Sequence, residues 1–487
     1  MMQTTTAEAP IRAVATRTLA DLPGPRGVPV FGNLLQVDRS CIHRSVEAWA
    51  AEYGPYFRFR IGDRRFVAVG DHAALAALLR DRPDGVRRGA KLAAIWKELG
   101  LEEGVFIAEG EAWRRQRRMV MAGFDPAHVR DYMPSLLTVT ERLRRRWAGA
   151  AARGEAIDLQ PDLMRFTVDA IAGLAFGADV NTLESDDEII QQHLDKIFPA
   201  LFNRVMAPLP VWRWFRSPAD RRLEQSVAAV KVAIGEFIAA ARGRLAADPA
   251  LRARPRNLLE AMLVASDGEA DGAPTEDGAV AGNVVTMLLA GEDTTANTLA
   301  WMLYLMARHP ATLARAVDEV RTAFPDGELI PDRINALDYV EACAHETMRL
   351  KPVAPFIGLQ LLRDTVVGDV AMPAGTVVWG MMRRDSVDNQ HFPDATEFRP
   401  ERWLADGGPA QAASTAKRVS MPFGAGPRVC PGRYLALLEM KMFMAMLLAR
   451  FDVLGVDTED GGEAREQLQF TMSPVGLRLR LRERVFA

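Results

Sequence analysis

Apolar residues recur every three or four positions through most of the chain between residues 69 and 365, and this spacing is typical of one face of an α-helix. Glycine, proline and aspartate divide this region into separate helices. No fixed-period repeat and no Gly/Ser-rich linker divides the 487 residues, so the sequence favours neither a solenoid nor a string of linked domains. The fold class that we predict is therefore mainly α: a single large helical domain with a small β-rich part.

Two segments show the pattern of strands instead. Residues 56–61 alternate apolar and polar side chains, Gly62-Asp63 follows as a turn signal, and residues 66–69 are again rich in strand formers. This pattern predicts a β-hairpin. A second hairpin is predicted for residues 365–382, with its turn near residues 373–375.

The charge balance and the cysteine content exclude several classes of protein. Lys and Arg number 60 against 63 Asp and Glu, and a net charge of -3 does not favour nucleic acid or an anionic membrane as a partner of the whole surface. The three cysteines, Cys41, Cys343 and Cys430, include no Cys-x-x-Cys pair. We therefore expect neither a disulfide framework nor a four-cysteine metal site, and a reducing compartment is the default.

The start of the chain carries no targeting signal that we can identify. Residues 1–20 contain no apolar run of signal-peptide or membrane-span length. We expect a cytoplasmic protein without a membrane anchor, in which a flexible segment of residues 1–22 precedes one domain of residues 23–487.

A glycine-rich loop leads into a long apolar segment near the C-terminal end. The loop reads Phe423-Gly424-Ala425-Gly426-Pro427-Arg428-Val429-Cys430-Pro431-Gly432. Glycines let backbone N–H groups turn toward a sulfur atom, and the following helix adds the positive end of its dipole. Both features favour a deprotonated, metal-binding thiolate at Cys430. The alternative is that Cys430 is a small buried hydrophobic residue, which is the usual role of a lone cysteine.

A polar cluster interrupts an apolar segment that we expect to be helical from about residue 275 to His309. The cluster, Ala-Gly-Glu-Asp-Thr-Thr, occupies residues 290–295. A threonine hydroxyl can donate to the carbonyl four residues before it, loosen the helix and admit water. Such a groove suits proton delivery. The alternative is that these polar residues occupy a solvated face or pair locally.

Two further pairs are spaced to share a helix face. Glu346 and Arg349 can form an ion pair, which on a surface helix would be an ordinary solvated pair. Trp113 and Arg117 can direct an indole N–H and a guanidinium to one carboxylate, and guanidinium geometry suits that ligand. A basic surface helix is the alternative for the second pair.

The loop from Phe423 to Gly432 has the pattern Phe-Gly-x-Gly-x-Arg-x-Cys-x-Gly, which resembles the haem-binding signature of the cytochrome P450 superfamily. The other three groups of residues lie in the order and at the separations of that family, so the resemblance covers nearly the whole chain. It implies a single mainly α-helical domain that encloses haem b, iron protoporphyrin IX, and carries a small β-rich lobe.

The resemblance implies a role for each of these residues. Cys430 would be the axial ligand of the haem iron, within a loop that includes Phe423, Gly424 and Gly432. The residues that would bind the haem propionates are Trp113, Arg117, Arg428 and, as a further candidate, Lys91.

The resemblance also assigns the polar cluster and the ion pair. Asp293 and Thr294 would form the acid–alcohol pair that relays protons, and Gly291 would allow dioxygen and substrate a close approach. A structural triad would hold the backbone of the cysteine loop; its members would be Glu346, Arg349 and Arg402, the last from a Pro-x-Arg-Phe-like segment in which Trp403 replaces Phe.

The implied activity is that of a haem-thiolate monooxygenase, which inserts one oxygen atom from O2 into a hydrophobic organic substrate by hydroxylation or epoxidation. Because the haem domain uses up 487 residues, we expect two electrons from NAD(P)H to arrive through a separate ferredoxin- or flavodoxin-type donor with its reductase. The alternatives are a haem-thiolate peroxygenase or isomerase, against which Asp293 and Thr294 argue, and a non-catalytic haem sensor.

The remaining cations of these motifs suggest where a donor would dock. We expect a basic patch for an acidic electron-transfer partner, made of Arg114, Arg115, Arg118, Arg433 and Lys441. The substrate pocket would be apolar and formed by residues 95–108, 198–214, 287–293, 353–359 and 470–472.

Overall fold

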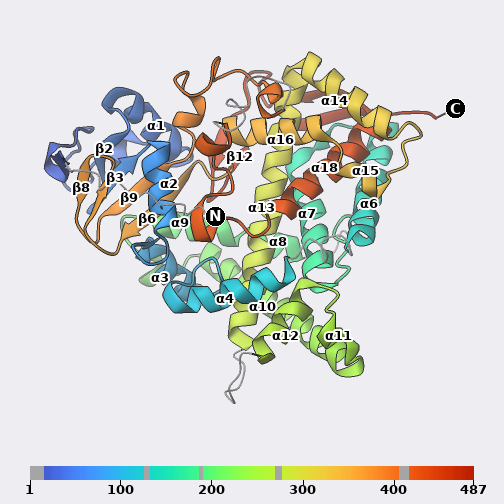
Figure 1. The fold of residues 1–487 in the computed structure, drawn as a ribbon, viewed down its shortest axis with the longest axis horizontal. Helices are drawn as coiled ribbons and strands as arrows, with labels where there is room; N and C mark the ends of the chain where they lie inside the picture. The colour runs from blue at the N-terminus through green and yellow to red at the C-terminus, as the bar shows by residue number, and fades with distance from the viewer. Residues whose placement is uncertain (1–15, 125–131, 186–189, 269–276, 405–415, 487) are drawn as a thin grey trace, which may run out of the picture.

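The computed structural model describes residues 16–124, 132–185, 190–268, 277–404 and 416–486. Helices make up most of the described chain, and the largest sheet gathers at one side of the body (Figure 1). The predicted mainly α fold with a small β-rich lobe is confirmed.

The helices, in chain order, are α1 (Ile42–Tyr53), α2 (His72–Arg80), α3 (Ala90–Glu98), α4 (Gly110–Gly123), α6 (Met133–Ala152), α7 (Leu159–Phe176), α8 (Ile190–Leu194), α9 (Ile197–Met206), α10 (Pro218–Ala247), α11 (Ala250–Ala253), α12 (Leu258–Gly268), α13 (Asp277–Arg308), α14 (Pro310–Ala323), α15 (Pro331–Ile334), α16 (Asp338–Leu350) and α18 (Arg433–Arg450). The strands are β1 (Arg17–Thr18), β2 (Tyr56–Ile61), β3 (Arg64–Val69), β4 (Val86–Arg88), β5 (Ile157–Asp158), β6 (Phe356–Leu361), β7 (Thr365–Val367), β8 (Val370–Met372), β9 (Val377–Met381), β10 (Phe451–Asp457), β11 (Glu466–Leu468), β12 (Met472–Pro474) and β13 (Arg478–Glu483).

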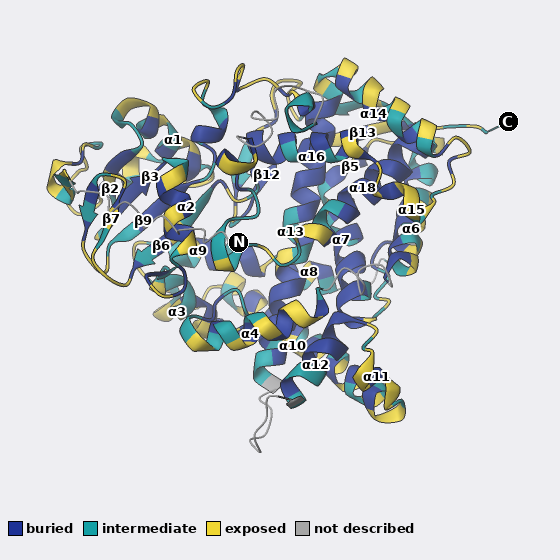
Figure 2. Ribbon diagram, viewed as in Figure 1, coloured by how far each residue is buried: buried dark blue, intermediate teal, exposed yellow. Residues whose placement is uncertain are grey.

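Helix α13 is the axis of the helical body. Its apolar side chains, among them Leu288, Leu299 and Trp301, are buried, as expected for a helix enclosed by its neighbours. It packs against α7 and α16 and runs through the middle of the molecule (Figures 1 and 2). The helix ends at Arg308, next to the predicted His309, because Pro310 cannot extend its hydrogen-bond ladder.

Helix α18 follows the cysteine loop and is buried over most of its length (Figure 2). Glu439 and Lys441 lie inside it and are also buried. The described part of the chain contains no helix that is long and apolar enough to cross a membrane.

The largest sheet has the strand order β2-β3-β9-β6-β4. The predicted hairpin of residues 56–69 is confirmed, since β2 pairs antiparallel with β3 and Tyr56 lies opposite Val69. Strand β9 joins β3 in parallel and β6 antiparallel, so the sheet brings distant parts of the chain together.

The second predicted hairpin, residues 365–382, is wrong in its pairing. The hairpin consists of β7 and β8, and its turn lies at Gly368-Asp369, where Gly368 has a φ of 61°. Residues 373–375 instead connect this hairpin to β9 in the large sheet. Alternating side chains mark a strand but do not say which neighbour it pairs with.

Residues 16–22, which the sequence predicted to be part of a flexible segment, lie against the body. Strand β1 pairs with β8, and the Arg17 guanidinium binds the Asp369 carboxylate at 2.7 Å. Leu22 is buried. The remainder of the predicted segment, residues 1–15, lies outside the described chain.

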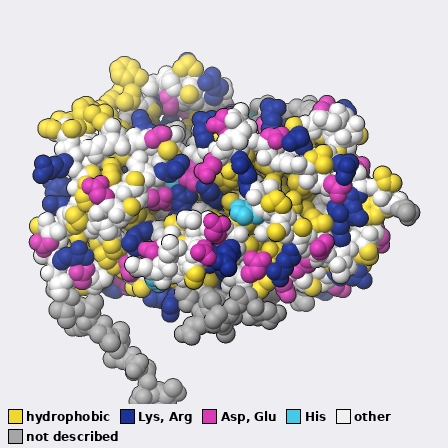
Figure 3. Space-filling model, turned by 90° about the horizontal axis from the view of Figure 1, so that it is seen from above, with side chains coloured by type: hydrophobic (Ala, Val, Ile, Leu, Met, Phe, Trp, Pro, Cys, Tyr) yellow, Lys and Arg dark blue, Asp and Glu magenta, His cyan; other side chains and the backbone are white. Residues whose placement is uncertain are grey.

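The visible surface in Figure 3 mixes basic and acidic side chains. This mixture agrees with the formal net charge of -3.

Candidate functional site

A cavity of about 470 Å³ lies between the cysteine loop, α13 and the large sheet. Every segment that the sequence predicted to line a pocket contributes to it. These contributors are Val105 and Phe106, then Phe202, Val205 and Met206, then Met287, Ala290 and Gly291, then Val353, Ala354, Phe356, Ile357 and Gly358, and finally Phe470. The Phe470 ring stacks on Phe198 with centroids 4.4 Å apart, and its φ of 92° is unusual for a residue with a side chain.

The cysteine loop directs Cys430 into this cavity. Gly424 and Gly426 adopt φ angles of 74° and 70°, which a side chain would disfavour. At Gly426 a Cβ atom would also lie 2.5 Å from the Leu79 carbonyl oxygen of α2. The amide of Cys430 donates to the Phe423 carbonyl at 2.9 Å and closes the loop.

The Cys430 thiol is accessible from the cavity, so it is not the buried hydrophobic residue of the alternative interpretation. Burial by the surrounding protein raises its pKa, while the Gly432 amide and the charges of Arg117 and Arg433 lower it. The sequence predicted that the loop would favour the thiolate. The Gly432 amide acts in that direction, but burial has the larger effect, so the pKa of the thiol is raised overall. A coordinated metal ion would deprotonate the thiol.

Four arginines line the cavity on the side of α4. Arg117 and Arg428 were expected there, whereas Arg82 and Arg88 carry no sequence motif and were missed. Burial lowers the pKa of each of the four guanidinium groups. Arg82 is also repelled by the positive charge of Arg428, and its pKa falls to about 10. The carboxylate that binds this cluster is Glu109, 2.6 Å from Arg428.

The arginine cluster fits a haem with its two propionates. Within the described chain, Nε and Nη2 of Arg82 and Nε and Nη1 of Arg428 are buried without a hydrogen-bond partner. Buried guanidinium donors are costly when unpaired, and two carboxylates would satisfy them. The cavity also presents a sulfur ligand, so its donor set matches that of haem with a thiolate ligand.

Trp113 and Arg117 both lie on α4 and line the cavity. The Trp113 ring packs against the Arg428 guanidinium, with the carbon 4.9 Å from the ring centroid. Phe423, Gly424 and Gly432 of the loop line the cavity as well. Lys91 lines it too, but the charges that act on Lys91 are those of Arg64, Asp63, Arg213 and Glu98.

Gly291 and Thr294 face the cavity from α13. The Thr294 hydroxyl donates to the Ala290 carbonyl at 2.8 Å, which is the contact that the spacing predicted. A side chain at position 291 would press on Ile171 of α7, since a Cβ there would lie 3.0 Å from that residue.

Asp293 turns away from the cavity lining and toward the loop before β12. Its carboxylate accepts hydrogen bonds from the Asn297 amide at 2.8 Å and from the Thr471 hydroxyl. Burial nevertheless raises its pKa to about 6. The Asn297 oxygen in turn accepts a hydrogen bond from Gln160 at 2.9 Å, so a polar chain leads from Asp293 toward the partly exposed Gln160.

Glu292 and Glu439 are two buried carboxyl groups that sequence analysis did not assign. Glu292 is 2% exposed and lies against Asp195, so the idea of a solvated face is wrong for this residue. Burial and the neighbouring carboxyl group raise the pKa of Glu292 well above its usual value. On α18, burial raises the pKa of Glu439 to about 8 although the Thr295 hydroxyl binds it, and both residues line the cavity.

The structure brings Glu346, Arg349 and Arg402 together. Arg349 binds Glu346 through two hydrogen bonds of 2.8 and 2.7 Å, and Arg402 binds it at 3.2 Å. Glu346 and Arg349 are fully buried, so the surface-pair alternative is wrong. Arg349 also donates to the Ser386 and Ala395 carbonyls, which ties α16 to the chain after β9.

Trp403 does more than preserve an aromatic ring beside the triad. Its indole N–H donates to Glu346 Oε2 at 2.9 Å, and the ring stacks on His345 with centroids 4.9 Å apart. A phenylalanine at this position could not make the hydrogen bond.

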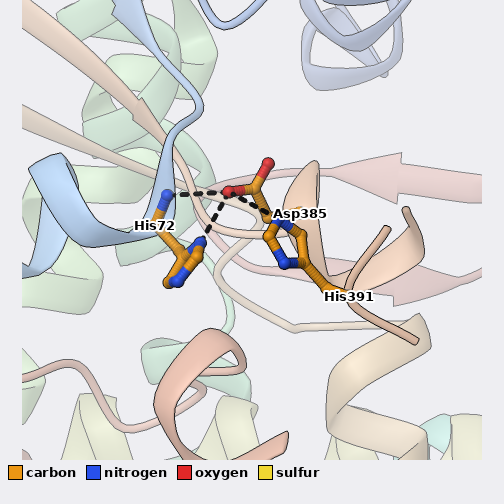
Figure 4. A group of neighbouring side chains, drawn as sticks. All are labelled: His72, Asp385 and His391. Atoms are coloured by element: carbon orange, nitrogen blue, oxygen red, sulfur yellow. Dashed lines mark hydrogen bonds and ion pairs between the residues drawn. The ribbon is translucent and has the colours of Figure 1, made fainter. Parts of the chain in front are cut away.

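His72, Asp385 and His391 form a separate cluster away from the cavity lining (Figure 4). The Asp385 carboxylate oxygen is 2.8 Å from the ring nitrogen of His72 and also accepts the His72 backbone amide. Both imidazoles point at this oxygen (Figure 4). Arg384 binds the other carboxylate oxygen of Asp385. These contacts anchor the start of α2 to the segment after β9.

The family model for cytochrome P450 matches residues 22–481. A self-sufficient cytochrome P450 monooxygenase of Aspergillus niger is 28% identical over 470 residues, which cover 94% of this chain and 43% of the relative. One of Exserohilum turcicum is 28% identical over 484 residues, which cover 95% of this chain and 42% of the relative. The chloroplastic protein LUTEIN DEFICIENT 5 of Arabidopsis thaliana is 27% identical over 415 residues, covering 82% of this chain and 67% of that protein.

The chain thus spans less than half the length of these self-sufficient relatives, at 43% and 42%. The family match itself extends over nearly all of the described helices and strands. The chain belongs to the cytochrome P450 family.

Proposed function

We propose that this chain is a haem-thiolate monooxygenase that inserts one oxygen atom of O2 into a hydrophobic organic substrate by hydroxylation or epoxidation. The observation that carries the proposal is the composition of one cavity. It holds an accessible cysteine sulfur, a cluster of buried arginines with unpaired donors, and a helix with a glycine and a threonine facing inward. Haem b bound there by the Cys430 thiolate would supply the activation of dioxygen and the transfer of oxygen.

The protein would hold this cofactor at two places. Cys430 would provide the axial ligand, on a loop that Gly424 and Gly426 allow to turn tightly. Arg82 and Arg428 have the donors to hold the propionates, with Trp113 packed beside them. The Glu346 triad ties α16 to the backbone of the chain after β9.

Two acid–hydroxyl pairs, one within α13 and one between α13 and α18, can move protons into the cavity. Asp293 is held by Asn297 and Thr471, and at neutral pH its pKa of about 6 leaves a minor protonated fraction. The adjacent Thr294 hydroxyl reaches the cavity and can pass a proton on. Glu439 holds its proton at pH 7 because its pKa is about 8, and Thr295 binds it.

The substrate surface of the cavity is formed mainly by aromatic and aliphatic side chains, among them Phe106, Phe202 and Phe470. Their apolar side chains favour a hydrophobic substrate and disfavour water beside the reacting atoms. Phe470 lines this surface and stacks on Phe198 behind it.

For electron supply, we propose a separate ferredoxin- or flavodoxin-type donor that draws on NAD(P)H through its reductase. An exposed basic surface is formed by Arg115 and Arg118 on α4 and by Arg433 at the start of α18. The prediction that Lys441 belongs to that surface is wrong, because Lys441 is 4% exposed and binds Glu341 at 2.7 Å.

Because its longer relatives are named self-sufficient, the source of electrons needs a direct test. The purified protein should consume NADPH and form product only when a ferredoxin and its reductase are added. A reducing, cytoplasmic compartment would suit its three free cysteines, and we propose that location.

The experiment for the reaction is a spectral binding screen with fatty acids, terpenoids, steroids and macrolide-like compounds, followed by turnover with surrogate redox partners. A monooxygenase should consume NADPH and yield a product that carries one oxygen atom from labelled O2. A haem sensor would bind ligands without turnover, and a peroxygenase would form product from peroxide alone.

A further inference from the structure

Three side chains of metal-binding type meet at the start of α2, far from the haem cavity lining. His72 is the first residue of that helix, Asp385 begins the short 3₁₀ helix after β9 (Asp385–Val387), and His391 follows on the same segment. One nitrogen or oxygen atom from each lies within 4.8 Å of the others. In the described chain they are the one such group of three histidine, cysteine or carboxylate ligands. We refer to them as the His72–Asp385–His391 cluster.

The Asp385 carboxylate does not bind both imidazoles. Its Oδ2 atom accepts a hydrogen bond from the His72 backbone amide at 2.8 Å and lies 2.8 Å from Nδ1 of the same residue. The Nε2 atom of His391 also points at Oδ2 but is 3.7 Å away, which is too far for a hydrogen bond (Figure 4). The cluster therefore converges on one oxygen atom without closing a direct contact between all three side chains.

The separations in the cluster are close to those between the ligands of a tetrahedral Zn²⁺ ion. Bonds of about 2.0–2.1 Å from zinc to nitrogen and oxygen put neighbouring ligand atoms about 3.4 Å apart. The distances from Asp385 Oδ2 to the two imidazole nitrogens, 2.8 and 3.7 Å, lie on either side of that value. Both histidines are partly exposed, so small rotations of their rings can bring all three atoms to bonding distance.

The remaining contacts hold the carboxylate in a fixed orientation. Asp385 is buried, and its Oδ1 atom is bound by the Arg384 guanidinium. Hydrogen bonds of this kind orient a metal-binding carboxylate. The partly exposed edges of His72 and His391 leave a route for an ion and a water ligand from the solvent. Because the positive charge of Arg384 opposes a cation, we expect weaker binding than at a four-ligand structural zinc site.

We propose that the His72–Asp385–His391 cluster binds one Zn²⁺ ion through His72 Nδ1, Asp385 Oδ2 and His391 Nε2, with water as the fourth ligand. The ion takes the place of the proton between His72 and Asp385, and that proton is released to the solvent. Two imidazole nitrogens favour Zn²⁺ over Mg²⁺, which prefers oxygen ligands.

A bound ion would tie the start of α2 to a segment that lies 313 residues away in the sequence. The other end of α2 supports the cysteine loop, because Gly426 of that loop packs against the Leu79 backbone. The zinc ion would thus stabilise the position of the helix on which this loop rests.

The alternative is that the cluster serves only to hydrogen-bond α2 to the segment after β9. Two substitutions separate the roles. His72→Asn places an amide near the position of Nδ1, and His391→Gln places one near the position of Nε2, so each keeps a hydrogen-bond donor and removes an imidazole ligand. The matched control is His345→Gln, because His345 lies 3.8 Å from one carboxylate, that of Glu341, and belongs to no three-ligand group in the described chain.

The experiment titrates untagged, haem-loaded protein, previously treated with EDTA, with ZnCl2 and separately with MgCl2 in isothermal titration calorimetry. We expect wild type and His345→Gln to bind one Zn²⁺ per chain at this site and to show no binding of Mg²⁺. His72→Asn and His391→Gln should each bind Zn²⁺ at least about tenfold more weakly. Zn²⁺ should also raise the melting temperature of wild type and His345→Gln, but not that of the two cluster variants.

Equal affinity for Zn²⁺ in wild type and both cluster variants overturns the proposal, as does a wild type without saturable zinc binding. Should one cluster variant fail to fold, the other still removes a ligand, from a different segment of the chain. Crystals of the wild type soaked in ZnCl2 provide a second measurement. An anomalous scattering peak at the zinc edge should lie between the three side chains, and a zinc-soaked crystal without that peak contradicts the site. Neither measurement depends on turnover.

Discussion

Replacing Asp293 by asparagine should stabilise the protein above pH 6 and impair its turnover. The pKa of Asp293 rises from 3.8 to about 6 on folding, so the folded protein holds this proton more tightly than the unfolded chain does. Stability attributable to this group is therefore lost as pH rises from about 4 to about 6 and stays low above that range. At about 1.4 kcal/mol per pKa unit, the charged carboxylate costs the fold up to about 3 kcal/mol.

The surrounding hydrogen bonds allow this substitution. An asparagine oxygen at position 293 can accept from Asn297, and its amide can donate to Thr471, whose hydroxyl is able to reverse its role. The variant should thus lose the charge without leaving a buried group unpaired.

The assay is equilibrium unfolding in urea, followed by circular dichroism, of the haem-loaded wild type and Asp293→Asn at several pH values. Between pH 5 and pH 8 the wild type should lose about 1.4 kcal/mol relative to the variant, because all other titrating groups are shared. Product formation per NADPH should fall in the variant over the same range. A difference in stability that does not change with pH would refute the assigned burial of a titrating carboxylate, and unchanged product yield would refute its role as a proton donor.

Three further substitutions probe separate parts of the site. Thr294→Ala removes the hydroxyl that faces the cavity, so electrons should be diverted to peroxide, and a product-to-NADPH ratio equal to that of the wild type would contradict the relay. Trp403→Phe removes one hydrogen bond to the buried Glu346 and should lower the free energy of unfolding by about 1.5 kcal/mol; an unchanged value would show that the indole contact is not formed in solution. Gly426→Ala should greatly reduce haem content, because its Cβ would lie 2.5 Å from the Leu79 carbonyl oxygen, and normal haem loading would mean that the loop can move away from α2.

Sequence motifs predicted the groups that act through local spacing. Cys430 could be assigned from the glycines and the arginine of its own loop. The hydrogen bond of Thr294 to the Ala290 carbonyl could be predicted because the two residues are four positions apart in a helix. The burial of Glu346 and Arg349 needed the family resemblance, because a pair three residues apart has the same spacing on a surface helix.

Other members of the site are brought together by the tertiary fold and leave no local trace. Nothing in the local sequence distinguishes Arg82 and Arg88 from the other arginines of the chain. The fold of α2 and β4 places both beside Arg428 at the cavity. A solvated face stayed open as an alternative for Glu292 because its partner Asp195 lies far away in the sequence. The same limit explains the second hairpin, since pairing of strands is decided by tertiary contacts and not by the alternation of side chains.

The most direct test of the account is the absorption spectrum of the reduced protein with carbon monoxide, recorded for wild type and Cys430→Ser. Wild type should show the red-shifted Soret band of a thiolate-ligated haem, and the variant should lose that band even if it still retains haem. A wild-type spectrum without this band, or its persistence in Cys430→Ser, would contradict the assignment of Cys430 as the iron ligand.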